Sequence, residues 1–198
     1  LAAYDGERMI GFAFSIPAIH HPDGWPFWHS HMTGVLAEYR NQGVGWKLKQ
    51  AQRASAIKAG LPLIEWTFDP LELKNAFFNI EKLGVIARRY VYNQYGFTSS
   101  PLHGGLPTDR LVAEWWLKHP RAVTAEAGSP PPRPEIAERV TYPNNIAELR
   151  RDQSAQARKI QEDAAEQFTR HFSQGLAVVG FEKGEESSSY LLGPWDSK

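Results

Sequence analysis

The most constraining feature of the sequence is the junction at residues 36–45, where a strand-like run meets a helical pattern. Residues 29–36 have strand character, and after the junction apolar side chains recur at helical spacing, at Val44, Leu48, Ala51, Ala54 and Ile57. Gly43 and Gly45 lie where one pattern gives way to the other. A strand that enters a helix through so short a turn leaves the first four helical N–H groups without intrahelical partners. Those groups, the helix dipole and the open glycine backbone favour a bound phosphate.

Extended and helical patterns alternate through the first 118 residues. Residues 1–4 and 9–14 flank a turn and predict a hairpin. Further strands are expected at 63–68, 85–95 and 111–117, and a helix is expected at 71–83. We therefore predict a core domain over residues 1–118.

The remainder of the chain is expected to form a linker and an appendage. Residues 119–134 contain Gly128-Ser129-Pro130-Pro131-Pro132, which is incompatible with a helix or a central strand and is interpreted as a linker. Residues 135–198 are predicted to form a β-α-β-β appendage, whose long helix is capped by Asn144 or Asn145 and ends at Gly175.

Composition excludes several classes of function. The chain of 198 residues has 22 basic and 22 acidic residues, so no overall field recruits nucleic acid or an anionic membrane. It has no cysteine, which excludes thiolate nucleophiles, disulfides and cysteine-ligated zinc and makes a reducing cytoplasm the expected setting. No apolar run approaches the ~20 residues of a membrane span. Because the chain starts at Leu1 within a strand pattern, we expect natural N-terminal sequence to be missing.

The junction resembles a known coenzyme-binding loop. Residues 40–45 read R-x-x-G-x-G, and residues 35–45 closely resemble the acyl-coenzyme A pyrophosphate loop of the GNAT N-acetyltransferase superfamily. Later in the chain, Ala76, Lys82, Leu83 and Gly84 match the family's N-x-x-A-x-x-x-Y-x-K-L-G-F helix. Nucleotide triphosphatase and dinucleotide loops fit poorly, because the Gly-Lys-Ser/Thr step and the third glycine are absent. The resemblance covers about residues 1–118.

The resemblance implies a GNAT-like α+β fold with a mixed sheet whose fourth and fifth strands, here 29–36 and 63–68, splay apart. Acetyl-coenzyme A or another acyl-coenzyme A would be the co-substrate, with its pantetheine arm in the gap. The arm would pair with the backbone like an added strand, and helical N–H groups would hold the pyrophosphate. The residues implied in cofactor binding are Thr33, Gly34, Val35, Leu36, Arg40, Asn41, Gln42, Gly43, Val44, Gly45 and Asn75. For Asn75 a purely structural role is the alternative.

Direct acyl transfer to an amine needs a base, an oxyanion donor and an acid for the departing thiolate. In the family a backbone N–H of the fourth strand meets the oxyanion, here near Val35 or Leu36. His31 is the first candidate base and His29 the second, since the two share one strand face, and Glu65 in the opposite strand is comparable. A hydrogen-bonded histidine and a solvated glutamate are the structural alternatives.

The sequence differs from the family at the position of the general acid. The family's tyrosine position is occupied by Ile80 and its asparagine position by Leu73. The acid would then come from Tyr90, Tyr92 or Tyr95, of which we select Tyr92, or the thiolate leaves unassisted. A different class of function is also open, because a domain without the acid would bind acyl-coenzyme A without catalysis.

The remaining expectations concern metals and partners. His20, His21 and Asp23 lie near His29 and His31 in the sequence and permit a metal site, although their spacing is not distinctive and we assign no metal ligand. The predicted function is transfer of an acetyl or other short acyl group to the amine of a small molecule, with amino acids among the candidates. Neither nucleic acid nor a membrane is an expected partner, and a homodimer is left open.

Overall fold

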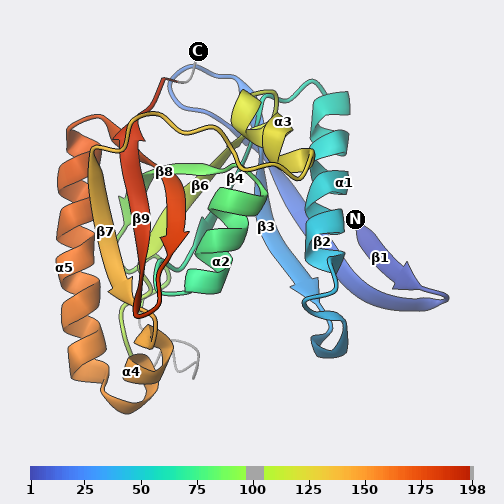
Figure 1. Cartoon of the computed structure of the whole chain (residues 1–198). Coiled ribbons are helices and arrows are strands. Elements are labelled where there is room, and N and C mark those ends of the chain that lie inside the picture. Colours follow the sequence, from blue (N-terminus) through green and yellow to red (C-terminus); the bar gives the residue numbers. More distant parts are fainter. Residues whose placement is uncertain (97–104, 197–198) are drawn as a thin grey trace. The chain divides into compact units, whose positions relative to one another are not determined.

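The computed structural model describes residues 1–96 and 105–196 (Figure 1), and the chain forms two compact units. Unit 1 comprises Leu1–Trp66 and Glu114–His119, and unit 2 comprises Thr67–Ala113 and Pro120–Lys198. The chain passes between the units within two strands, β4 (Leu63–Phe68) and β6 (Arg110–Trp116). Each unit is described by itself below.

Unit 1 is a sheet with one long helix against it. Its strands are β1 (Ala2–Asp5), β2 (Arg8–Ile19), β3 (Pro26–Val35) and the part of β4 up to Trp66, in the order β1-β2-β3-β4. The first three strands are antiparallel neighbours, whereas β3 and β4 are parallel. A short 3-10 turn, η1 (Ala37–Tyr39), follows β3 and leads to helix α1 (Val44–Lys58), which contacts β2 and β3. Figure 1 shows α1 running alongside these two strands.

A register shift in the β2–β3 ladder shapes this sheet. Phe14 is paired with Met32 but its neighbour Ser15 is paired with Ser30, so β3 has an extra residue, His31, at this point. A bulge of this kind bends its strand and is common next to functional sites. The bulge at His31 therefore divides β3 into two halves, and the second half leads to the loop that contains Gly43 and Gly45.

Unit 2 is built on a second set of strands. The order is β6 up to Ala113, β5 (Ile86–Val91), β8 (Leu176–Lys183), β9 (Ser187–Pro194) and β7 (Glu138–Pro143). The pairs β5–β8, β8–β9 and β9–β7 are antiparallel. The helical segments are α2 (Leu73–Phe77), the π-helical turn η2 (Phe78–Lys82), α3 (Pro120–Glu126), α4 (Ile146–Asp152) and α5 (Ser154–Ser173). Helix α5 contacts β5, β7 and β8, and the rings of Tyr142, Phe168, Phe181 and Tyr190 are fully or almost fully buried.

The expected α+β class with a mixed sheet is confirmed, because parallel and antiparallel pairs occur together. The predicted hairpin, the strand 63–68 and the helix that begins at Val44 are also found. The compact units do not follow the predicted boundaries at residues 118 and 135. The physical reason is strand pairing: β8 of the C-terminal segment pairs with β5, which places residues 67–113 with that segment.

Three predicted elements need correction. The helix expected at 71–83 is a short α-helix followed by a π turn, in which the N–H of Leu83 reaches back to the carbonyl of Phe78. The long C-terminal helix is interrupted at Gln153, whose φ of −141° is not helical. The expected linker contains helix α3, and Arg121 of that helix is buried and donates to the carbonyl of Pro132 at 2.6 Å.

The strand expected at 85–95 ends at Val91, because Asn93 has a positive φ and the chain turns there. Among the described residues, no helix combines the length and the apolar character that crossing a membrane requires.

Candidate functional site

The first turn of α1 presents uncapped backbone amides. Gly43 is the N-cap residue, with a left-handed φ of 81°, and no side chain caps the helix. The first ordinary helical bond runs from the N–H of Lys47 to the carbonyl of Gly43 at 3.0 Å. The N–H groups of Val44, Gly45 and Trp46 therefore have no intrahelical acceptor, and the helix dipole adds positive potential there. This helix end suits an anion.

Different physical constraints explain the two glycines of the loop, Gly43 and Gly45. Gly43 needs its residue type, because its left-handed conformation strains other side chains. Gly45 lies in the helix, where glycine costs about 1 kcal/mol relative to alanine. A Cβ at Gly45 would meet no atom of the chain within 4 Å. Nothing described in the chain requires glycine there, whereas a ligand lying on the backbone would.

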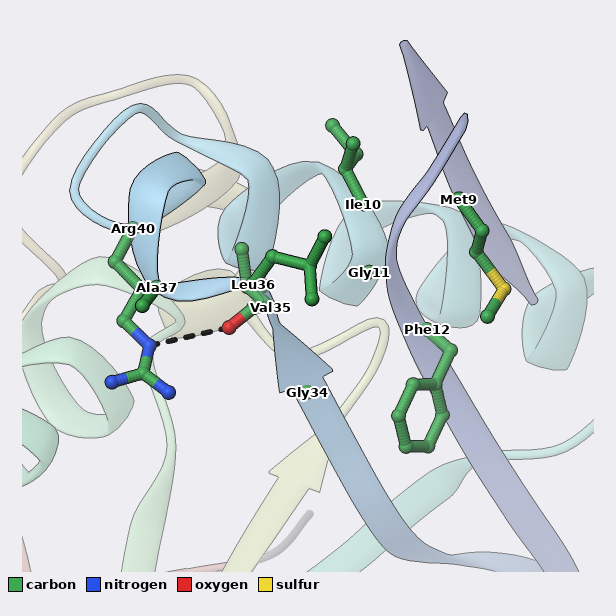
Figure 2. A pocket seen from close by; sticks show the side chains of 9 residues that line it. All are labelled: Met9, Ile10, Gly11, Phe12, Gly34, Val35, Leu36, Ala37 and Arg40. Atoms are coloured by element: carbon green, nitrogen blue, oxygen red, sulfur yellow. Dashed lines mark hydrogen bonds between the residues drawn. The ribbon is translucent and has the colours of Figure 1, made fainter. Parts of the chain in front are cut away.

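The turn before the helix is held by its own side chains. Gln42 donates to the carbonyl of Glu38 at 2.6 Å, and Asn41 adopts a positive φ of 60°. Arg40 donates through Nε to the carbonyl of Val35 at 3.2 Å. Figure 2 shows this bond, with the two terminal nitrogens of Arg40 pointing away from Val35. Arg40 is thus anchored at the end of β3 with its terminal donors still available to a ligand.

The second half of β3 has an unpaired edge on the β4 side. The β3–β4 ladder consists of Trp28 with Ile64 and His29 with Glu65 in the described part of the chain, although β3 continues to Val35. The other edge is occupied, because the N–H of Leu36 donates to the carbonyl of Ile10 in β2 at 2.9 Å. Alternate residues of a strand direct their backbone groups to opposite edges, so the groups of Thr33 and Val35 face the unpaired side.

This alternation separates the two predicted oxyanion donors. The N–H of Leu36 is already used by β2, whereas the N–H of Val35 points to the unpaired edge. Of the four strand residues predicted to pair with the coenzyme arm, Thr33 and Val35 therefore have suitably directed backbone groups. Gly34 and Leu36 instead belong to the β2 ladder and the pocket wall.

An apolar pocket of about 330 Å³ lies where β2 starts and β3 ends (Figure 2). It brings together four predicted residues, Gly34, Val35, Leu36 and Arg40, with residues from β2 that sequence reasoning missed. Those additional residues are Met9, Ile10, Gly11 and Phe12, together with Ala37 of η1. The pairing of β2 with β3 would have predicted these residues. In that pairing Phe12 lies opposite Gly34, and its ring is 2.9 Å from the position that a Cβ on Gly34 would occupy.

The candidate bases share one face of the unit 1 sheet. His29 and Glu65 are directly opposite each other on parallel strands, so their side chains point to the same face. The rings of His29 and His31 are 6.1 Å apart, and the ring of Phe14 meets that of His31 edge-on. Glu65 is buried, whereas His31 is exposed. The structure thus brings together three predicted chemical groups on this face.

Burial lowers the pKa of His29, and the charges of His31 and Lys49 lower it further. A lowered pKa keeps the imidazole neutral, and therefore able to accept a proton, at lower pH than an ordinary histidine. His29, the second candidate base in the sequence, thus has electrostatics that suit a base at neutral pH.

Helix α1, which covers the opposite face of the sheet, contains a buried lysine, Lys49, that sequence reasoning missed. Nζ of Lys49 donates to Oγ of Ser30 at 2.8 Å and to Oε1 of Gln52 at 3.0 Å, and it lies 3.7 Å from the centroid of the Trp66 ring. Burial lowers the pKa of Lys49 to about 7. The signal was present in the helix pattern, because Lys49 and Gln52 fall beside Leu48 and Ala56 on the inward face of α1.

Two predicted site residues belong to unit 2. The hydroxyl of Tyr92 is hydrogen-bonded to Oγ1 of Thr169 in α5 at 2.9 Å. Asn75 of α2 is exposed and lines a separate pocket of unit 2. Ile80, at the family's tyrosine position, is fully buried.

The structure does not form a metal site from the side chains that the sequence offered for one, which are His20, His21, Asp23, His29 and His31. Among the described residues, no group of three histidine, cysteine, aspartate or glutamate side chains is placed to share an ion. His20 is instead 3.2 Å from Asp23 and stacks on the ring of Trp25 at 4.4 Å.

Comparison with known proteins gives similarity only at the level of structure. No family model and no curated protein matches the sequence. The solved structures that match include Chaetomium thermophilum Naa20 in complex with a bisubstrate analogue, with a TM-score of 0.47 and 20% identity over 57% of this chain and 63% of that one. The chain thus spans less than two thirds of the Naa20 chain.

Two further matches are similar in extent. Arabidopsis thaliana Naa50 in complex with the bisubstrate analogue CoA-Ac-MVNAL has a TM-score of 0.46 and 21% identity over 57% of this chain and 69% of that one. An IAA acetyltransferase from Bacillus cereus has a TM-score of 0.45 and 14% identity over 57% of this chain and 73% of that one.

Proposed function

We propose that the chain is an acyl-coenzyme A-dependent N-acyltransferase of the GNAT superfamily, which transfers an acetyl or other short acyl group directly to the amine of a small molecule. The observation that carries the proposal is the uncapped start of α1 beside the unpaired half of β3. The first of these features favours binding of a diphosphate, and the second favours binding of an extended arm that contains amides. The pantetheine arm of coenzyme A has both amides and an adjoining diphosphate.

Each part of the coenzyme has a place in unit 1. The N–H groups of Gln42 to Gly45, with the terminal nitrogens of Arg40, would hold the diphosphate. The unpaired backbone groups of Thr33 would pair with the arm, whereas the carbonyl of Val35 already accepts from Arg40. The pocket of Figure 2 offers apolar surface beside these polar groups, which favours an organic ligand over a bare inorganic anion.

The chemistry would proceed on the face of β3 and β4 that holds the candidate bases. His31, His29 or Glu65 would remove a proton from the acceptor ammonium, directly or through water. The freed amine would then attack the thioester carbonyl, and the N–H of Val35 would stabilise the oxyanion that forms. Collapse of the intermediate breaks the carbon–sulfur bond, the nitrogen loses its extra proton to give the amide, and the departing sulfur gains a proton to leave as the thiol. Tyr92 stays a prediction for the group that protonates the sulfur.

Titration calorimetry with acetyl-coenzyme A and the variant Gly45→Ala tests the coenzyme site. A Cβ at residue 45 meets no chain atom, so the variant should keep or gain up to about 1 kcal/mol of stability. Its affinity for the coenzyme should fall at least about tenfold, because the methyl group blocks close approach to the backbone. Ser55→Ala near the other end of α1 is the matched control, since it raises helix propensity away from the loop. Unchanged affinity in Gly45→Ala would refute the proposed site.

A second candidate function is coenzyme binding without catalysis. The observation in its favour is that Ile80, where the family has its acidic tyrosine, is fully buried and has no group to donate a proton. Release of free thiol from acyl-coenzyme A in the presence of a panel of amines distinguishes the two functions. The enzyme releases thiol only with an accepting amine, whereas a binding domain binds the coenzyme and releases none.

A further inference from the structure

Unit 2 contains a second pocket, of about 400 Å³, and most of the residues that line it have charged or polar side chains. Asp69 and Glu72 come from the segment between β4 and α2, and Asn75 comes from α2. Arg110 is the first residue of β6, and Arg150 lies in α4. Five charged or amide side chains from different elements thus converge on one cavity, which is large enough for a small organic molecule.

The inner wall of this pocket has one carboxylate for two guanidinium groups. Oδ2 of Asp69 lies 3.1 Å from Nη2 of Arg150 and 3.8 Å from Nη1 of Arg110. The other oxygen, Oδ1, accepts the backbone N–H of Leu71 at 2.8 Å. The side chains of Asp69, Arg110 and Arg150 are 14%, 10% and 7% exposed, so this buried group of three has a formal charge of +1.

Arg110 retains donors that its neighbours do not use. Its Nη1 donates to the backbone carbonyl of Asp109 at 2.8 Å and is also the atom nearest Asp69. Its guanidinium lies over the ring of Tyr95, 5.3 Å from the centroid. Among the described residues Nε and Nη2 have no acceptor, although the side chain lines the pocket. A planar guanidinium with free donors and little exposure is a good receptor for a carboxylate.

The rim of the pocket has the opposite charge. Glu72 accepts a bond from Nη1 of Arg150 through Oε1 at 3.1 Å, and its side chain is 54% exposed. Its second oxygen has no partner among the described residues. The pocket therefore has excess positive charge inside and an accessible carboxylate at its mouth.

We propose that this pocket binds a free α-amino acid as its zwitterion, with the carboxylate on Arg110 and the ammonium on Glu72. A ligand with a carboxylate and an ammonium attached to the same carbon can contact the guanidinium of the wall and the carboxylate of the rim at once. A simple dianion would be repelled by Glu72, and a simple cation would be repelled by the inner arginines. The proposal does not depend on acyl transfer, because it concerns binding in unit 2 in the absence of coenzyme.

Titration calorimetry of the full chain without coenzyme, using a panel of free L-amino acids at millimolar concentration, tests the proposal. At least one amino acid should bind to a single site. Its carboxamide and its N-acetyl derivative should each bind at least about tenfold more weakly, because each loses one charge-assisted interaction. Absence of binding by every free amino acid would overturn the proposal, as would equal binding of the free and N-acetylated forms.

Variants assign the binding to this pocket. Glu72→Gln should weaken the free amino acid about tenfold and leave the N-acetyl derivative unchanged, because only the ammonium contact is lost. Its half-exposed position makes it compatible with folding, so it remains informative if Arg110→Gln fails to fold. Arg110→Gln, if folded, should lose both ligands. Arg151→Gln is the matched control, since Arg151 follows the pocket residue Arg150 in the sequence but is exposed and paired with Asp152. Wild-type affinity for the free amino acid in Glu72→Gln would overturn the assignment.

Discussion

Replacing the buried lysine of unit 1 by methionine should change stability with a sign that depends on pH. Lys49 is almost completely buried under the sheet, and burial lowers the pKa of its ammonium from 10.5 to about 7. The unfolded chain therefore binds more protons than the folded chain between about pH 7 and pH 10.5, so stability rises with pH across that interval. Below pH 7 the folded protein bears the full cost of a buried charge, and above pH 10.5 it bears none.

The magnitude follows from the shift. A pKa lowered from 10.5 to about 7 corresponds to about 5 kcal/mol, at about 1.4 kcal/mol for each pH unit. The Trp66 ring beneath Nζ stabilises the ammonium by up to about 2 kcal/mol, so about 3 kcal/mol is the lower bound. Methionine fills a similar volume but loses the bonds to Ser30 and Gln52, at about 1 kcal/mol each. Lys49→Met should therefore be more stable than wild type by about 1 to 3 kcal/mol at pH 6 and less stable by about 2 kcal/mol near pH 10.5.

Urea denaturation of both proteins at pH 6, 8 and 10.5 measures the difference, with equal m-values as the check that both unfold in the same way. Lys47→Met is the matched control, because it removes an exposed lysine from the same helix without touching the buried cluster. A free-energy difference between Lys49→Met and wild type that stays constant across this range would refute the reasoning, since it would mean that the buried amine does not change its charge there.

Three further predictions concern single residues. Gly84→Ala should destabilise the protein by about 3 kcal/mol or more in urea denaturation, because its φ is 73° and the new Cβ would lie 2.4 Å from the carbonyl oxygen of Arg121. Gly128→Ala, with a similar φ but open space, should cost only about 1 kcal/mol, and equal costs would exclude the clash as the cause. Tyr92→Phe should reduce thiol release if the Tyr92 hydroxyl protonates the sulfur. A variant with wild-type activity that is about 1 kcal/mol less stable would show that this hydroxyl only stabilises the fold, through its bond to helix α5. If His29 is the base, the acid limb of the pH profile for thiol release should have its midpoint below the ordinary histidine value of about 6.5, and a midpoint above that value would exclude it.

The catalytic contribution of the predicted bases has its own test. If His31 or Glu65 is the base, the double variant His31→Ala and Glu65→Ala should abolish most thiol release while binding of acetyl-coenzyme A persists, because these side chains lie on the sheet face and the proposed coenzyme site is built from backbone groups. Thiol release at wild-type speed in this variant would show that neither residue is the base.

Local patterns were enough to predict the elements around the loop that contains Gly43 and Gly45. The strand 63–68, the start of α1 at Val44 and the hairpin follow from side-chain periodicity and from turn residues, which act over a few neighbours. The same reasoning failed at 71–83 and at Gln153, where the chain departs from a regular α-helix. It also failed at Arg121, because a proline-rich composition does not reveal that a buried arginine anchors the segment.

The sequence by itself determined that a glycine turn joins a strand to a helix, because glycine spacing and helical periodicity are local properties. Only the tertiary structure decided which backbone groups remain unpaired, since that depends on how far β4 follows β3 and on which edge β2 occupies. The buried amine of Lys49 and the unequal charges around Asp69 likewise depend on contacts between residues distant in the chain. Burial and long-range pairing set these electrostatic properties, and no short stretch of sequence specifies them.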